Sequence, residues 1–101
     1  MGVVYLIHFQ ESYRHARHYL GFVHSPGGLQ KRLANHRAAR LETWVRHRQS
    51  KLMAAVGTAG IGWELARTWE NKTIEDERRM HRAGKNTQLC PICNPKEEAV
   101  A

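Results

Sequence analysis

The sequence predicts a small α/β (α+β) domain in which a three-stranded antiparallel sheet is flanked by helices, in the order ββααβα. Residues 3–9 and 18–23 are rich in β-branched and aromatic side chains, and residues 61–69 alternate large apolar and polar side chains. Helix-forming residues separate the second strand from the third. A chain of 101 residues suits one domain. We expect residues 1–95 to fold together and residues 96–101 to form a flexible tail.

The elements are expected to begin with an antiparallel hairpin, whose strands at 3–9 and 18–23 are joined by a long loop at 10–17. Pro26 and the two glycines after it end the strand pattern. Apolar residues at helical spacing then predict helices at 29–40 and 41–56.

The third strand and the last helix follow. Alternation in 61–69 places four apolar residues on one side of the sheet: Ile61, Trp63, Leu65 and Trp69. Thr73 and Asp76 have the spacing of a helix capping box, and Gly84 suits a helix C-terminus. We therefore expect a final helix between Thr73 and Gly84.

Positive charge is concentrated in the first half of the chain. The net charge is +7, and residues 1–51 hold nine Lys and Arg against two acidic residues, whereas residues 52–101 hold seven of each. Such an excess favours a phosphate-bearing partner, although a solvated basic surface without a partner is the plainer interpretation. No apolar run approaches the roughly 20 residues of a membrane span. Two cysteines are too few for a disulfide framework, so we expect a cytoplasmic (intracellular) protein and no membrane partner.

Five short motifs occur in a fixed order along the chain. They are Val3-Val4-Tyr5, Tyr19-Leu20-Gly21, Lys31-Arg32-Leu33-Ala34-Asn35-His36, Glu77, and Pro91-Ile92-Cys93-Asn94. In this order the chain resembles the GIY-YIG nuclease family. Val3 replaces the first glycine of that pattern, and Cys93 replaces an aromatic residue. The resemblance implies a stand-alone endonuclease that hydrolyses DNA phosphodiester bonds.

The resemblance also implies roles for individual residues. The catalytic set would be Tyr5, Tyr19, Arg32, His36 and Glu77, with Glu77 as the ligand of Mg²⁺ or Mn²⁺. Gly21 and Asn94 would be structural. DNA would be the partner, contacted by Arg14, Arg17, Lys31, Arg37 and Arg40, and the sequence leaves open whether a second copy joins as a homodimer partner.

The chemistry of these residue types agrees with such roles. An arginine fork suits the oxygens of a phosphate, and Mg²⁺ takes one or two carboxylates together with several waters. A tyrosine has an unperturbed pKa near 10, so Tyr5 would need cationic neighbours, such as Arg32 or His36, to act as a base. Glu75 is the alternative to Glu77, since both lie in the first turn of the expected helix.

Two other interpretations remain open. The first is a non-catalytic, basic nucleic-acid-binding module that uses no metal. The second is an interaction module stabilised by zinc at Cys90 and Cys93. Zinc is disfavoured here because a structural site needs four ligands, and only His81 suggests itself as a third. The remaining histidines are expected to be surface or strand residues: His8, His15, His18, His24 and His47.

Overall fold

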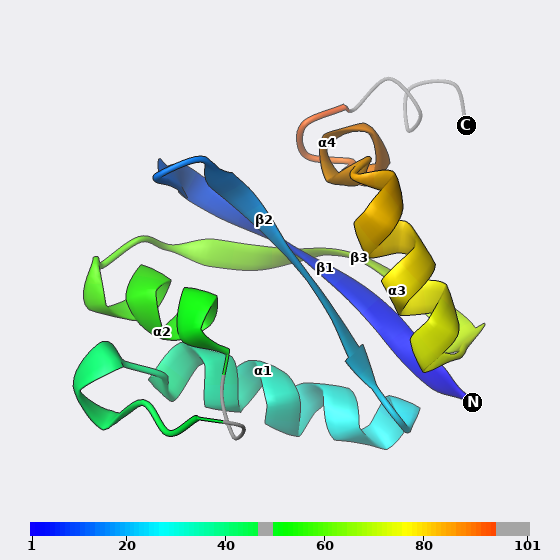
Figure 1. The fold of residues 1–101 in the computed structure, drawn as a ribbon, viewed down its shortest axis with the longest axis horizontal. Helices are drawn as coiled ribbons and strands as arrows, with labels where there is room; N and C mark the ends of the chain where they lie inside the picture. The colour runs from blue at the N-terminus through cyan, green and yellow to red at the C-terminus, as the bar shows by residue number, and fades with distance from the viewer. Residues whose placement is uncertain (47–49, 95–101) are drawn as a thin grey trace.

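The computed structural model describes residues 1–46 and 50–94, which form a three-stranded antiparallel sheet with helices on both faces (Figure 1). The strands are β1 (Gly2–Tyr13), β2 (Ala16–Val23) and β3 (Trp63–Lys72), in the spatial order β2-β1-β3. The α-helices are α1 (Leu29–Ala38), α2 (Lys51–Thr58), α3 (Ile74–Ala83) and α4 (Asn86–Leu89), with short 3₁₀ helices at Pro26–Gly28 and Leu41–Thr43. The α+β class is confirmed. The observed order is ββααβαα, so the expected order ββααβα lacks one helix, α4. The sequence does not reveal α4, because four residues are too few to show an apolar period.

Two helical layers cover opposite faces of the sheet. Val3, Tyr5, Ile7 and Phe9 of β1 pack against apolar side chains of α1 and α2. The alternate residues Val4 and Leu6 pack against α3, α4 and the fully buried Cys90. Strand β1 is therefore buried on both faces over most of its length, and β2 forms one edge of the sheet.

The β1–β2 hairpin is longer than the sequence predicts. Its ladder continues to the pair Tyr13 and Ala16, and Arg14 adopts a positive φ of 55° in the turn. The expected long loop at 10–17 is wrong, because polar residues form solvated strand ends there. The side chain of Arg17 contributes by donating hydrogen bonds to the carbonyls of Phe9 and Gln10, at 2.9 and 3.2 Å.

Strand β3 does not keep its large side chains on one side. Trp63 belongs to the core under α1 and α2, whereas Trp69 packs against the core under α3. The pairing of β1 with β3 shifts register between Leu6 and Ile7, where their partners are Arg67 and Leu65. One extra residue in β3 reverses the alternation from that point, so the predicted common face is wrong.

The expected helix at 41–56 is also wrong. Helix α2 begins at Lys51, where the Ser50 side chain accepts a hydrogen bond from the backbone N–H of Met53. Leu41 and Val45 are 40% and 49% exposed, so they do not extend the apolar stripe of α2 into the core. Residues 47–49 lie outside the described residues, as do residues 95–101, on which the expected tail falls.

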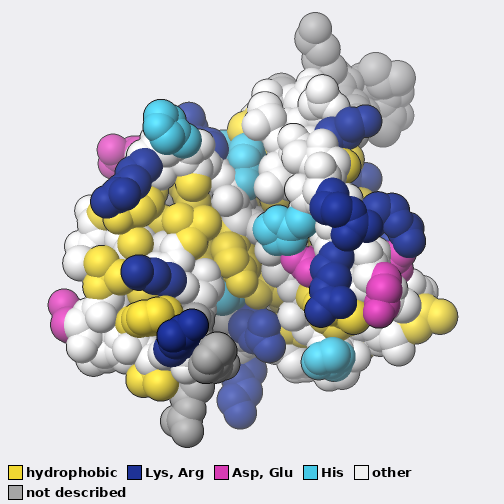
Figure 2. Space-filling view, in the orientation of Figure 1, with side chains coloured by type: hydrophobic (Ala, Val, Ile, Leu, Met, Phe, Trp, Pro, Cys, Tyr) yellow, Lys and Arg dark blue, Asp and Glu magenta, His cyan; other side chains and the backbone are white. Residues whose placement is uncertain are grey.

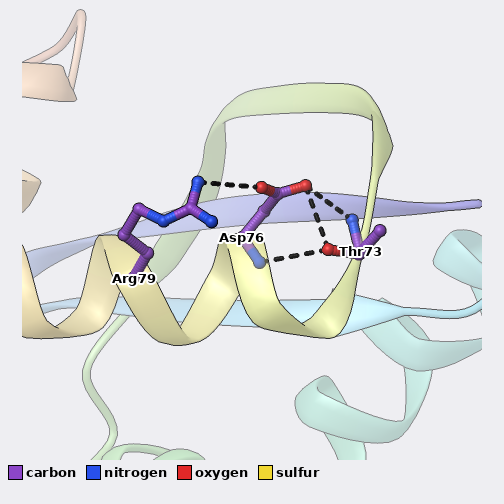
Figure 3. A network of polar contacts seen from close by, with 3 residues as sticks. All are labelled: Thr73, Asp76 and Arg79. Atoms are coloured by element: carbon purple, nitrogen blue, oxygen red, sulfur yellow. Dashed lines mark hydrogen bonds and ion pairs between the residues drawn. The ribbon is translucent and has the colours of Figure 1, made fainter.

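Helix α3 begins and ends as the sequence predicts. Thr73 and Asp76 form a reciprocal capping box, and Arg79 donates a hydrogen bond to the Asp76 carboxylate (Figure 3). Gly84 ends the helix in the left-handed conformation, with φ of 63°. The cap fixes the first turn of α3, which carries Glu77. None of the helices in residues 1–46 and 50–94 has the length and apolarity of a membrane span.

Candidate functional site

A cluster of two tyrosines and a histidine lies between the sheet and α1. Tyr5 is fully buried, and its Oη lies 2.8 Å from Nε2 of His36. The Tyr19 ring lies 5.1 Å from the His36 ring and 6.1 Å from the Tyr5 ring, measured between centroids. Three of the expected catalytic residues, from β1, β2 and α1, are therefore in mutual contact.

Gly21 gives the cluster the space it needs. Gly21 pairs with Tyr5 across the hairpin, and a Cβ at this position would lie 2.5 Å from Tyr5 Oη and 2.8 Å from Cε2 of Tyr19. Real Cβ atoms do not approach other atoms so closely. The structural role expected of Gly21 thus has a physical reason, since a larger residue would displace the Tyr5 ring.

The environment keeps both partners of the Tyr5–His36 hydrogen bond neutral near pH 7. Burial raises the pKa of Tyr5, as does the neighbouring Tyr19, and Arg32 opposes this shift without reversing it. Burial, reinforced by Arg32, lowers the pKa of His36 to about 4. His36 therefore does not supply the positive charge that would lower the Tyr5 pKa, and a Tyr5 base must pass its own proton onward.

Arg32 extends from α1 to the edge of the sheet. Its side chain is solvent-exposed, and Nη1 donates a hydrogen bond to the Phe22 carbonyl of β2 at 3.2 Å. Arg32, Lys31 and Asn35 line a surface pocket of about 330 Å³ together with residues at the end of β2. This pocket has the charge and the open access that a phosphate would require.

Glu77 approaches β2 from the opposite helical layer. Its Oε1 lies 2.9 Å from Nε2 of His81, one helical turn further along α3, and the Glu77 side chain is only 12% exposed. The same His81 nitrogen lies 3.2 Å from the Leu20 carbonyl oxygen. Because both neighbours are acceptors, Nε2 of His81 carries the proton. His81 thus connects Glu77 to the residue that follows Tyr19.

Side chains from both helical layers contact backbone carbonyls of β2. Leu20 and Phe22, whose carbonyls bind His81 and Arg32, are two residues apart, which is about 7 Å along a strand. Arg32 and the Glu77–His81 pair therefore flank one short stretch of β2. The tyrosine cluster lies on the α1 face of that stretch, and Glu77 comes from the α3 face.

Basic side chains lie over both helical layers (Figure 2). In the view of Figure 2, Lys and Arg side chains gather over the α1–α2 layer and also over α3, so the positive surface is not confined to the first half of the chain.

The residues expected to contact DNA differ in whether their side chains already contact other parts of the protein. Lys31 lines the Arg32 pocket, and Arg14 is exposed in the hairpin turn. Arg37 stacks 4.0 Å above the Trp63 ring, and the guanidinium of Arg40 donates to the carbonyls of Arg37 and Ala39.

A second cluster lies beside α4 on the other face of the sheet. His8, His18, Cys90 and Cys93 each direct one donor atom toward the others, and all four atoms lie within 4.8 Å of one another. These residues could hold a metal ion, and two imidazoles with two thiols are donors typical of zinc. A zinc site at Cys90 and Cys93 would thus take its two further ligands from His8 and His18, the strand histidines for which we expected no such role. His81, the ligand that we considered, is engaged with Glu77. Asn94 closes the turn around Cys90 through its backbone N–H, which donates to the Cys90 carbonyl at 2.9 Å.

Comparisons of this chain with family models, with curated proteins and with solved structures find no match. The GIY-YIG resemblance therefore rests on the quoted motifs.

Proposed function

We propose that this protein is a metal-dependent endonuclease that hydrolyses DNA phosphodiester bonds at the β2 edge. The observation that carries the proposal is the convergence of Arg32 and the Glu77–His81 pair on neighbouring carbonyls of β2, beside Tyr19. Phosphodiester hydrolysis needs a cation on the phosphate oxygens, a carboxylate for a divalent metal, and a base for water. Residues of all three kinds flank this stretch of the strand.

Each substrate contact follows from the chemistry of the side chain. The exposed Arg32 fork binds two non-bridging phosphate oxygens, and Lys31 contributes charge to the same pocket. Glu77 fits Mg²⁺ or Mn²⁺, since its carboxylate is a hard donor and its Oε1 alone is engaged by His81. A divalent cation held by Glu77 would stabilise the negative charge that develops on the phosphate oxygens.

Tyr5 and His36 together serve as the base. As water attacks phosphorus, the bond from phosphorus to the leaving sugar oxygen breaks, and that oxygen takes a proton from solvent water. The proton of the attacking water passes to Tyr5 Oη, and the phenol proton passes to Nε2 of the neutral His36 over their 2.8 Å hydrogen bond. This relay avoids a free phenolate, which the raised pKa of Tyr5 disfavours. The negative charge of a phosphate bound at Arg32 would stabilise the imidazolium that forms, against the burial that lowers the His36 pKa to about 4. Tyr19 lies against the His36 ring and positions the water or the phosphate.

A second candidate is a basic module that binds nucleic acid without cutting it. The raised pKa of Tyr5 favours this candidate, because a phenol that keeps its proton is a poor base for hydrolysis. Such a module would use the same Lys31 and Arg32 surface. Its binding would weaken as salt rises, and no Mg²⁺-dependent product would form.

Incubation with DNA distinguishes the two functions. The purified chain is incubated with supercoiled, branched and single-stranded DNA, with and without Mg²⁺ or Mn²⁺. We expect cleavage of at least one form only with metal, and we expect Arg32→Ala to abolish it. Lys72→Ala, which removes a positive charge from β3 at the opposite edge of the sheet, serves as the control and should cleave normally. Salt-sensitive binding without any metal-dependent product would instead establish the non-catalytic module.

A further inference from the structure

The cluster of His8, His18, Cys90 and Cys93 has the dimensions of a metal site. Nδ1 of His8 lies 3.4 Å from Nε2 of His18 and 3.6 Å from Sγ of Cys90. Sγ of Cys93 lies 3.4 Å from the His8 nitrogen and 3.3 Å from the His18 nitrogen. A tetrahedral zinc ion, with Zn–N bonds of about 2.0–2.1 Å and Zn–S bonds of about 2.3 Å, separates two nitrogens by about 3.4 Å and a nitrogen from a sulfur by about 3.5 Å. The four distances match these edges of a tetrahedron.

Hydrogen bonding does not account for this convergence. Nδ1 of His8 has three close neighbours, the His18 nitrogen and both sulfurs. A neutral imidazole nitrogen offers either one proton or one lone pair, so it can form one good hydrogen bond in the ring plane. A central cation that all four atoms face satisfies them together.

Burial and charge also suit zinc. Cys90 is fully buried, and His8 and His18 are 7% and 9% exposed. Two thiolates would neutralise the charge of Zn²⁺, so the filled site has no net charge to bury.

The backbone brings the four ligands together from distant parts of the chain. His8 and His18 are cross-strand partners in the hairpin, and their rings meet edge to face at 5.2 Å. Cys90 and Cys93 lie just after α4, in a turn closed by the Asn94 N–H. Cys90 packs in the α3–α4 layer with Val4 and Leu6. The histidine–cysteine cluster and the tyrosine cluster are therefore on opposite faces of the sheet.

We propose that His8, His18, Cys90 and Cys93 bind one Zn²⁺ ion in a closed tetrahedral site that fastens the segment after α4 to the β1–β2 hairpin. Four protein ligands leave no open coordination position, so the ion is structural and takes no part in phosphodiester cleavage. The site uses none of the residues of the proposed nuclease centre, so the zinc proposal and the nuclease proposal can be tested separately.

Elemental analysis of the full-length protein, purified without chelator and without a polyhistidine tag, tests the proposal. We expect about one zinc per chain, as a closed four-ligand site requires. His18→Gln and Cys93→Ser should each lose the ion. His15→Gln, which changes an exposed histidine of the hairpin turn, should retain it. Protein that stays free of zinc after incubation with one equivalent of Zn²⁺ would overturn the proposal, as would full zinc content in both ligand variants.

Two further measurements keep the test valid if a ligand variant folds poorly. Chelation of the wild-type protein should lower its Tm by about 10 °C or more, and added Zn²⁺ should restore it. Co²⁺ in place of zinc should give the intense visible bands of a tetrahedral ion and a sulfur-to-cobalt charge-transfer band. An unchanged Tm together with the weak spectrum of octahedral Co²⁺ would refute a closed His₂Cys₂ site.

Discussion

Gly21 is the residue on which the tyrosine cluster most plainly depends. Gly21→Ala would place a Cβ 2.5 Å from Tyr5 Oη, in a region where Tyr5 is fully buried. The Tyr5 ring must then move away from His36, at a cost of about 1–3 kcal/mol in unfolding free energy. Urea denaturation measures this cost, and DNA cleavage measures the loss of the Tyr5–His36 contact.

Gly27→Ala is the matched control for that substitution. A Cβ on Gly27 would meet nothing within 4 Å. We expect its unfolding free energy and its cleavage rate to stay at the wild-type level. If Gly21→Ala is as stable and as active as Gly27→Ala, the packing described for Tyr5 is incorrect.

His36 makes the stability of the fold depend on pH. Its pKa falls from 6.5 to about 4 in the folded chain because the imidazole is buried. Between these values the unfolded chain binds a proton that the folded chain does not, so stability decreases as the pH falls from 6.5 toward 4. His36→Gln should therefore lose about 1 kcal/mol less stability than the wild type between pH 7 and pH 5, after an allowance for solvent screening. Urea titrations of both proteins at the two pH values measure the difference, and equal pH dependence would refute a buried neutral His36.

The two clusters differ in how far the sequence predicts them. Tyr5, Tyr19 and His36 lie in short motifs, and the structure brings these three together. The roles of His8 and His18 are not visible in the same way, because they depend on which residues face each other in the hairpin. The register shifts between His8 and Tyr13, so the position of the turn does not reveal that pairing. The sequence pattern that indicates this cluster is a pair of strand histidines together with Cys-x-x-Cys further along the chain.

At the scale of elements, the sequence predicts helix ends that depend on residues close together in the chain. It does not predict features that depend on contacts between distant residues. The start of α3 is determined within four residues by the Thr73–Asp76 capping box, and its end by Gly84, so the sequence is sufficient there. The prediction of a helix at 41–56 assumed that one apolar stripe continues through Ser50. Ser50 instead caps a new helix, and Leu41 donates its backbone N–H to Thr58 rather than to a helical turn of its own.

Strand β3 illustrates the same limit. Its position in the chain follows from alternating side chains, but the face on which each side chain lies depends on an irregularity in pairing with β1. Such an irregularity arises between two strands and leaves no mark on one of them alone. Trp63 and Trp69 consequently enter different cores.

At the scale of the whole molecule, the sheet separates two kinds of chemistry. The α1 face holds the tyrosine cluster, and the α3–α4 face holds the proposed zinc ligands. The β2 edge is where Arg32 from one layer and Glu77, through His81, from the other approach the same strand. Basic side chains lie over both layers (Figure 2), so a nucleic-acid backbone could contact both layers at once.

The initial rate of DNA nicking in Mg²⁺ tests this account most directly, with Glu77→Gln compared with Glu75→Gln. Both glutamates lie in the first turn of α3, but Glu77 is paired with His81 at β2 whereas Glu75 is exposed. We predict that Glu77→Gln lowers the rate by about 100-fold or more, as expected when the ligand of a catalytic metal is lost, and that Glu75→Gln stays close to wild type. Wild-type nicking by Glu77→Gln, or equal losses in both variants, would contradict the account.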